Sequence, residues 1–382
     1  MALLIILVFL VLDFAMLSYE SRLFAGLGYE LGGGTAALAL TALLFSALAL
    51  RFAFGGRFLA WSALLSLLVI QLISVLCFPL DPARSDMLPL VELAGSRFLS
   101  GASPYSNVMA WDGVMTYLPG LWLSYVPSVF LGVDVRFTNL LCLAVAFVVI
   151  LRTCRHLGVE RRAIPYMCAF FLNPWMAFRH DVYIPVVLMQ LALVSCFLLQ
   201  GRIRSSMAAF AWAFCSYPYS WVVFPLFLAL LFRISGRRAV LSAILWAAGA
   251  FAVLVIPFLA WAPGIMIHSV LGVWRGVSLI ESYNLSFWVL RILPLDAIKP
   301  FQALVLLGFY ALVLGRIRNA KGFFALSAVA VLLFTMTSQL VWHYFFLLPP
   351  LFMLFHALAE DAAGEGGTLP PVRSGSGPGA DR

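Results

Sequence analysis

Apolar segments about as long as a membrane is thick recur along this chain. Runs of about 17 to 25 mostly apolar residues, the length a helix needs to cross a bilayer core, recur from Met1 to about Ala359. The 382 residues are 64% hydrophobic and only 10% charged, whereas roughly a quarter of a soluble domain is charged. The sequence therefore predicts an all-α polytopic membrane protein with a single transmembrane domain over residues 1–359.

The basic residues gather in short segments between the apolar runs. The positive-inside rule places these segments in the cytoplasm, where they meet anionic lipid. The net charge is +8, but the basic residues form no stripe, so nucleic acid is not an expected partner. The apolar N-terminal run lacks the basic start and cleavage site of a signal peptide and predicts a retained first helix. The clusters are Arg51/Arg57, Arg152/Arg155/Arg161/Arg162, Arg202/Arg204, Arg233/Arg237/Arg238 and Arg316/Arg318/Lys321.

An even number of crossings must separate neighbouring cytoplasmic clusters, and this parity sets the expected topology. It places 79–136 and 262–300 outside as two large loops. Residues 117–132 contain two prolines and several aromatic residues, which favours an interfacial helix over a spanning one. Residues 204–233 favour a hairpin of two short helices. The expectation is a bundle of about twelve transmembrane helices with both termini in the cytoplasm, followed by a disordered Gly/Pro/Ser-rich tail over 360–382.

Asp86 opens the first large outer loop. It precedes apolar residues at helical spacing, which predict a short amphipathic helix that stops near Gly101 and Pro104. An ionisable group near bilayer depth is costly and therefore suggests function. The carboxylate fits a general base acting on an acceptor hydroxyl, with Arg84 as a phosphate or carboxylate partner. The alternative is that Asp86 only caps the helix, since Asp is a favoured N-cap residue.

The order of motifs in this loop resembles a known family. Asp86 is followed by "FLSGASPY" at 98–105 and "TYLPGLWLSYVPSVFLG" at 116–132. This order is similar to the first outer loop of GT-C glycosyltransferases, nearest to the branch that uses polyprenyl-phosphate mannose or related pentoses. There an acidic residue, an "l-x-G-x-x-PY" segment and a "Y-x-P" motif lead into an interfacial helix. Here the usual "YPP" reads Tyr117-Leu118-Pro119, and the loop follows the third predicted helix instead of the first. The resemblance covers residues 80–240.

The resemblance implies roles for residues in this half of the chain. It implies that Asp86 is the catalytic base and that Tyr117, in the "Y-x-P" motif, contacts substrate. Arg179, His180 and Asp181 fall at a predicted outer helix junction, where members of the family often have a polar turn. A cation there suits a lipid-linked phosphate, because the arginine fork matches phosphate oxygens. The alternative for this junction is a short solvated loop.

The second outer loop and the last helix supply further candidates. Arg275 is a candidate phosphate ligand, and Glu281 and Asn284 are candidates for reading sugar hydroxyls. The alternative for each is decoration of the membrane interface. His343 lies at the outer end of the last predicted helix, where a lone histidine is more often a packed residue than a ligand.

Together these features predict an inverting glycosyltransferase. The donor would be a polyprenyl-phosphate sugar, with mannose expected, and the acceptor a glycolipid or cell-envelope glycan at the outer face of a bacterial plasma membrane. No cofactor or metal is required, and the six cysteines lack C-x-x-C spacing and suit small core positions. The alternatives are a transporter or flippase of lipid-linked sugars, which should show two similar halves with interrupted helices, and a non-catalytic membrane subunit.

Overall fold

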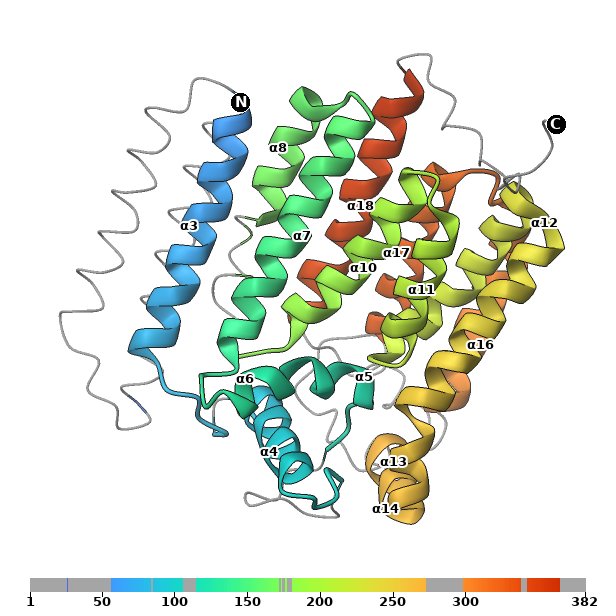
Figure 1. The fold of residues 1–382 in the computed structure, drawn as a ribbon. Helices are drawn as coiled ribbons and strands as arrows, with labels where there is room; N and C mark the ends of the chain where they lie inside the picture. The colour runs from blue at the N-terminus through green and yellow to red at the C-terminus, as the bar shows by residue number, and fades with distance from the viewer. Residues whose placement is uncertain are drawn as a thin grey trace, which may run out of the picture.

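A computed structural model describes residues 26, 56–83, 85–105, 115–171, 173, 176, 181–272, 298–337 and 342–364. Every regular element among those residues is a helix, which confirms the expected all-α class for them. The long helices lie side by side as a bundle, and the short ones gather at one end of it (Figure 1). This end contains the residues of the first outer loop.

The helices fall into two groups by length and position. The bundle consists of α3 (Gly56–Cys77), α7 (Arg136–His156), α8 (Glu160–Phe171), α10 (Ile184–Leu199), α11 (Ile203–Phe214), α12 (Pro218–Leu254), α16 (Ile298–Val313), α17 (Ala320–Thr337) and α18 (Trp342–Gly364). The short helices are α4 (Met87–Leu99), α5 (Pro119–Trp122), η1 (Leu123–Tyr125), α6 (Val126–Phe130), α13 (Ile256–Trp261) and α14 (Pro263–Ile267). Because α18 ends at Gly364, it extends past residue 360, where the sequence placed the start of a disordered tail.

Several helices have the length and composition of membrane spans. Within the described ranges, four stretches are long and apolar enough to cross a bilayer, namely Ala60–Cys77, Arg136–His156, Pro218–Trp261 and Ala320–Thr337. This number is consistent with a membrane protein, whereas the expected total of about twelve crossings stays a prediction. The helices expected within residues 1–55 lie outside the described residues, apart from residue 26.

The α12 segment is two helices that meet at a glycine. Gly236 has φ 75° and ψ −174°, a conformation that residues with a side chain rarely adopt. The chain reverses there, so that the second half of α12 returns toward α13 (Figure 1). The first half of α12 and α11 form the hairpin that the sequence predicted over 204–233, with Pro218 at the first position of its second helix.

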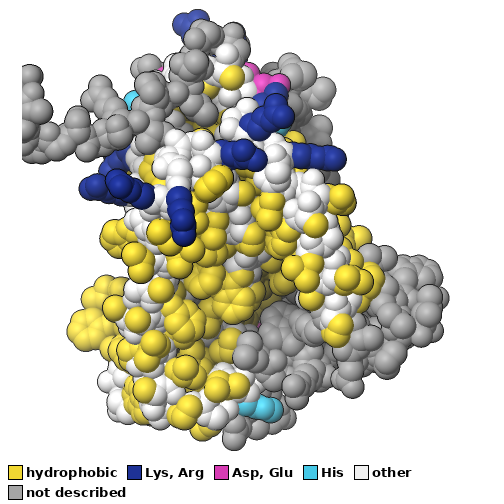
Figure 2. Space-filling model, turned by 90° about the vertical axis from the view of Figure 1, so that its right-hand side faces the viewer, with side chains coloured by type: hydrophobic (Ala, Val, Ile, Leu, Met, Phe, Trp, Pro, Cys, Tyr) yellow, Lys and Arg dark blue, Asp and Glu magenta, His cyan; other side chains and the backbone are white. Residues whose placement is uncertain are grey.

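Basic residues mark one end of the bundle. The turns from α7 to α8 and from α10 to α11, the reversal within α12 and the start of α17 all lie at the end opposite α4 (Figure 1). Figure 2 shows lysine and arginine side chains gathered near this end, above a broad apolar surface. In the second half of α12, Leu245 and Val253 are 71% and 73% exposed. This segregation is the one that the positive-inside rule describes for membrane proteins.

Residues 117–132 do not form one spanning helix. They are divided into α5, η1 and α6, which together lie across the end of the bundle (Figure 1). A continuous helix of about 20 residues would be needed to cross a bilayer. The short helices agree with the expectation that this segment does not span, and its place at a membrane interface stays a prediction.

Candidate functional site

Asp86 stands at the N-cap position of α4, but its side chain makes no capping hydrogen bond. A capping aspartate would accept a hydrogen bond from a backbone N–H in the first turn of the helix. The interpretation of Asp86 as a cap is therefore not supported by its side-chain geometry. The helix itself is the predicted one, because Leu88, Leu90 and Ala94 are buried in it and the helix stops just before Gly101.

Asp86 is exposed as a residue, but the surrounding protein partly desolvates its carboxylate. Burial by the surrounding protein raises its pKa above the ordinary value, because a partly desolvated carboxylate favours its neutral form. Burial also raises the pKa of Tyr117 well above the usual value, and the charge of nearby Asp86 raises it further. The two candidate residues therefore lie close enough for the charge of Asp86 to act on the Tyr117 hydroxyl.

The two motif segments meet beside Asp86. The Tyr105 hydroxyl donates a hydrogen bond to the backbone oxygen of Tyr117, with an O–O distance of 2.8 Å. The indole nitrogen of Trp122 donates to the Tyr105 hydroxyl at 3.3 Å. Since Tyr105 ends the "FLSGASPY" segment, this contact fixes one motif against the other.

A row of tyrosine rings runs from Tyr117 into the bundle. The ring centroids of Tyr117 and Tyr183 are 4.6 Å apart, and those of Tyr183 and Tyr217 are 5.4 Å apart. Tyr219 stacks on Tyr217 at 5.1 Å. All four side chains are buried. We call Tyr117, Tyr183, Tyr217 and Tyr219 the tyrosine row.

Sequence reasoning missed Tyr183 and Tyr217, although a local pattern marks them. Tyr183 is the N-cap of α10, and Tyr217 is the N-cap of α12. Each precedes a proline in the first turn of its helix, as Tyr117 precedes Pro119 at the start of α5. Tyrosine one or two residues before a helix-starting proline therefore recurs at this end of the bundle, and it would have singled out all three residues.

Asp181 lies directly beneath the segment that carries Asp86. Its backbone oxygen accepts a hydrogen bond from the Ser85 hydroxyl at 3.5 Å. The neighbouring oxygen of Val182 accepts from the amide of Asn139 at 2.8 Å. Because the Asp181 side chain is only 2% exposed, the alternative of a solvated loop is wrong for this residue.

The other candidate residues lie outside what the structure describes. His343 belongs to α18, but its side chain is not among those described. The remaining ones lie outside the described residues altogether, so their proposed roles stay predictions. They are Arg84, Arg179, His180, Arg275, Glu281 and Asn284.

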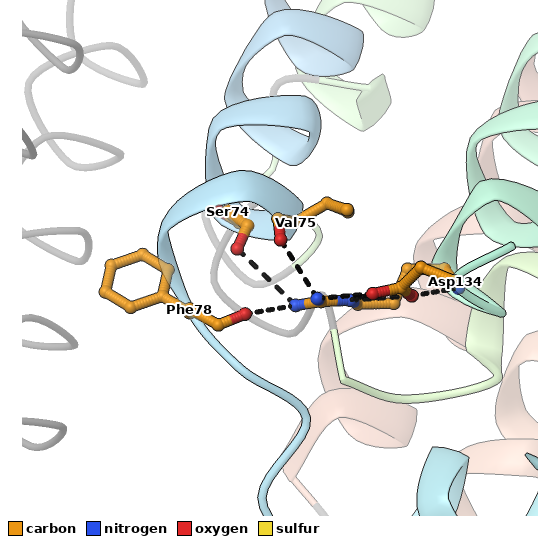
Figure 3. Close-up of polar contacts among 5 residues, drawn as sticks. Ser74, Val75, Phe78 and Asp134 are labelled. Carbon is orange, nitrogen blue, oxygen red and sulfur yellow. Dashed lines mark hydrogen bonds and ion pairs between the residues drawn. The ribbon is translucent and has the colours of Figure 1, made fainter. Parts of the chain in front are cut away.

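Arg136 anchors the helix that leads into the loop. Its guanidinium pairs with Asp134 at 2.6 Å, and it donates to the backbone oxygens of Phe78, Val75 and Ser74 at 2.6, 3.0 and 3.4 Å (Figure 3). These oxygens belong to the C-terminal end of α3, where a cation is favourable. Sequence reasoning missed Arg136, because the pattern "DVR" at the start of a helix does not indicate which other helix it would cap.

Among the described residues, neither the cysteines nor a cluster of metal-binding side chains provides further chemistry for this site. Five of the six cysteines are buried and all are free, which confirms their interpretation as small core residues. Within the described ranges, no group of three or more His, Cys, Asp or Glu side chains is placed to hold a metal ion. The chemistry available among the described residues is therefore that of a carboxylate beside buried phenols.

Comparison with protein-family models, with curated proteins and with solved structures finds no match to this chain. The chemistry of the site therefore has to be inferred from its own residues. A partly exposed carboxylate with a raised pKa is a stronger proton acceptor than an ordinary one and is suited to general base catalysis.

Proposed function

We propose that this chain is a membrane-embedded inverting glycosyltransferase in which Asp86 is the general base. The observation that carries the proposal is the Asp86 carboxylate, which is free of the capping hydrogen bond its position would allow and has a raised pKa. The resemblance of its loop to that of GT-C glycosyltransferases supports the choice of reaction. The basic end of the bundle would face the cytoplasm, and the Asp86 end would face outward, at a bacterial plasma membrane.

The proposed reaction transfers a sugar, with mannose expected, from a polyprenyl-phosphate donor to a hydroxyl of a glycolipid or cell-envelope glycan. Asp86 would accept the hydroxyl proton while the acceptor oxygen bonds to the anomeric carbon. The bond from that carbon to the phosphate oxygen breaks, and the lipid phosphate leaves with the electron pair. Attack on the face opposite the leaving phosphate inverts the anomeric centre.

The departing phosphate requires positive charge nearby, because charge develops there in the transition state. Arg84, Arg179 and Arg275 are the candidates for this role. Arginine suits it because its planar fork matches phosphate oxygens and it stays charged at all relevant pH values. Each of the three, replaced by methionine, is expected to raise the KM for the donor or lower kcat.

Tyr117 would shape the floor of the site beneath the sugar. Its side chain is only 7% exposed, so most of its ring is occupied by the tyrosine row and little is left for substrate. The resemblance implies that Tyr117 contacts substrate directly. Such a contact would be limited to the exposed edge of its ring. Its larger contribution would be the shape of the surface next to Asp86.

The test is transfer of radiolabelled sugar from a panel of polyprenyl-phosphate donors, using membranes that contain wild type or Asp86→Asn at matched abundance. Loss of a general base should lower the rate by about 10² to 10⁴-fold. Asp81→Asn is the matched control, because Asp81 lies in the same segment and its carboxylate accepts a hydrogen bond from the Ala83 N–H at 2.8 Å. This control should keep wild-type transfer.

Two outcomes would count against the proposal. Transfer that persists in Asp86→Asn would move the base elsewhere, with Glu281 and Asp181 the next candidates. No transfer from any donor in wild type would overturn the enzymatic function and favour transport or flipping of a lipid-linked sugar.

A further inference from the structure

Gly120 presses against the turn between α11 and α12. Its N–H donates a hydrogen bond to the backbone oxygen of Cys215, with an N–O distance of 2.9 Å. A Cβ atom at position 120 would lie 2.6 Å from the Cys215 oxygen and 2.8 Å from the Ser216 hydroxyl. Because backbone atoms cannot yield as a flexible side chain does, only glycine fits here without a shift.

Trp212 bonds to the carbonyl group of the same glycine. Its indole Nε1–H donates a hydrogen bond to the Gly120 oxygen at 3.2 Å. Both backbone polar groups of Gly120 are therefore bonded to the α11–α12 hairpin, the donor to Cys215 and the acceptor to Trp212, which shares the Gly120 oxygen with the Ser124 hydroxyl at 3.0 Å. The ring of Trp212 also lines an apolar groove of about 590 Å³ between α11 and the second half of α12.

The turn that receives Gly120 is itself firmly held. The Ser216 hydroxyl accepts a hydrogen bond from the Gln190 amide at 2.8 Å and donates one to the Trp212 backbone oxygen at 2.9 Å. Ser216 and Gln190 are both fully buried. Since Gln190 belongs to α10, the turn is tied to a third bundle helix.

The same turn reaches Tyr117 by a second route. Tyr217, the next residue after Ser216, contacts Tyr183, which contacts Tyr117. The Tyr117 segment is therefore fixed through its backbone at Gly120 and through its ring at Tyr183. Both routes start from the α11–α12 turn.

We propose that Gly120 and Trp212 are positioning residues for the Asp86 site. The α11–α12 turn sets the place of the Tyr117 ring, and that ring sets where a substrate lies relative to the Asp86 carboxylate. The proposal rests on the proposed function, since it assigns a catalytic consequence to the contact. A shift of the ring changes the alignment of reacting groups more than it changes binding, so kcat should fall more than KM rises.

The first experiment compares Trp212→Phe with Trp221→Phe. Trp212→Phe removes the N–H that holds Gly120 and keeps an aromatic ring in the groove. It should lower kcat by about tenfold with less than a twofold change in the donor KM, as a small misplacement of reacting groups does. Trp221→Phe removes an indole N–H on the same hairpin, which donates to the Phe214 oxygen at 2.7 Å, and should leave both constants unchanged.

A second measurement does not depend on transfer. Cys215 is fully buried behind Gly120. In a full-length chain with Cys215 as its only cysteine, a maleimide should label this thiol slowly. Adding Gly120→Ala should speed labelling by more than tenfold if the contact opens at this point, while the protein remains in the membrane at wild-type abundance.

The outcomes separate the two proposals. Equal kcat values for the two tryptophan variants, or a change confined to KM, would overturn the positioning role and leave the proposed function standing. Unchanged labelling in Gly120→Ala would also overturn it. Absence of transfer in wild type would overturn the proposed function, and the catalytic role of Gly120 and Trp212 with it.

Discussion

Two aspartates at the same end of the bundle are held in opposite ways. Both carboxylate oxygens of Asp134 accept hydrogen bonds from Arg136, at distances of 2.6 to 3.1 Å. Asp86 makes no capping bond, and the hydrogen bond that lowers the pKa of its carboxyl comes from its own backbone and not from a cation. A carboxylate that is fully paired strengthens packing, whereas one left unpaired at the surface stays available for proton transfer.

The two arrangements also differ in their effect on the stability of the folded state. Partial burial of a charge disfavours the folded state, and burial raises the pKa of Asp86 even though a hydrogen bond from its own backbone lowers it. Asp134 avoids that cost through Arg136, whose side chain is almost completely buried at the junction of α3 and α7. The comparison predicts that substitutions at the two sites separate stability from activity.

The largest effect on stability is expected from Arg136→Met. This change leaves Asp134 and the backbone oxygens at the end of α3 without their donor, and it should lower the free energy of unfolding by about 3 kcal/mol. Thermal unfolding in detergent measures it. Arg155→Met is the control, because Arg155 pairs with Glu160 at 3.1 Å but is 43% exposed and should contribute little. Equal destabilisation in both variants would contradict the assignment of Arg136 as an anchor.

The next effect concerns the pH dependence of transfer. The base must be ionised, so kcat/KM should fall tenfold per pH unit below the pKa of Asp86. Because burial raises this pKa, the acidic limb should lie above the ordinary aspartate value of about 3.9. Tyr117 is the titratable side chain that interacts with Asp86 in the described structure, and it remains neutral across this range. A limb at or below the ordinary value would contradict the role of Asp86.

A smaller effect is expected on the stability of Asp86→Asn. The folded-state pKa of Asp86 is raised, so its charge lowers stability as the pH rises through that pKa. The variant should therefore unfold at a slightly higher temperature than wild type at neutral pH, and the difference should vanish in acid. Asp134→Asn should unfold at a lower temperature. The same sign for both variants would remove the distinction between the two aspartates.

The smallest effect is expected from Glu92→Gln. Burial and the charge of Asp134 raise the pKa of Glu92, while Arg136 lowers it. Although the protein partly desolvates its carboxylate, Glu92 is exposed as a residue, so the change should alter stability by less than about 0.5 kcal/mol and leave transfer intact. Loss of transfer in this variant would make Glu92, and not Asp86, the candidate base.

Local sequence pattern was sufficient to predict short helical elements such as α4. It was insufficient to predict which elements contact one another. Apolar spacing predicted α4, and the prolines favoured an interfacial helix over a spanning one at 117–132, where the structure has three short helices. These features depend on residues a few positions apart, which a sequence displays directly. For the site, the order of motifs in one loop was enough to name Asp86 and Tyr117 as candidate residues.

Contacts between distant segments were not predictable in the same way. Arg136 caps the end of α3, and the tyrosine row joins the starts of three helices. Such contacts depend on which helices become neighbours. Hydrophobic periodicity indicates which face of a helix is buried, but not which other helix covers that face. The contact of Gly120 was not predictable either, because nothing in "YLPGLW" indicates that a turn nearly a hundred residues later lies against this glycine.

The reversal at Gly236 has a consequence for how the chain enters a membrane. The two halves of α12 are joined by a single left-handed residue flanked by Arg233, Arg237 and Arg238. With these arginines retained in the cytoplasm, as proposed, the first half of α12 would end at the cytoplasmic face and the second half would start there. One short basic turn would then orient two neighbouring crossings, so removing its three arginines should weaken the orientation signal of both halves at once.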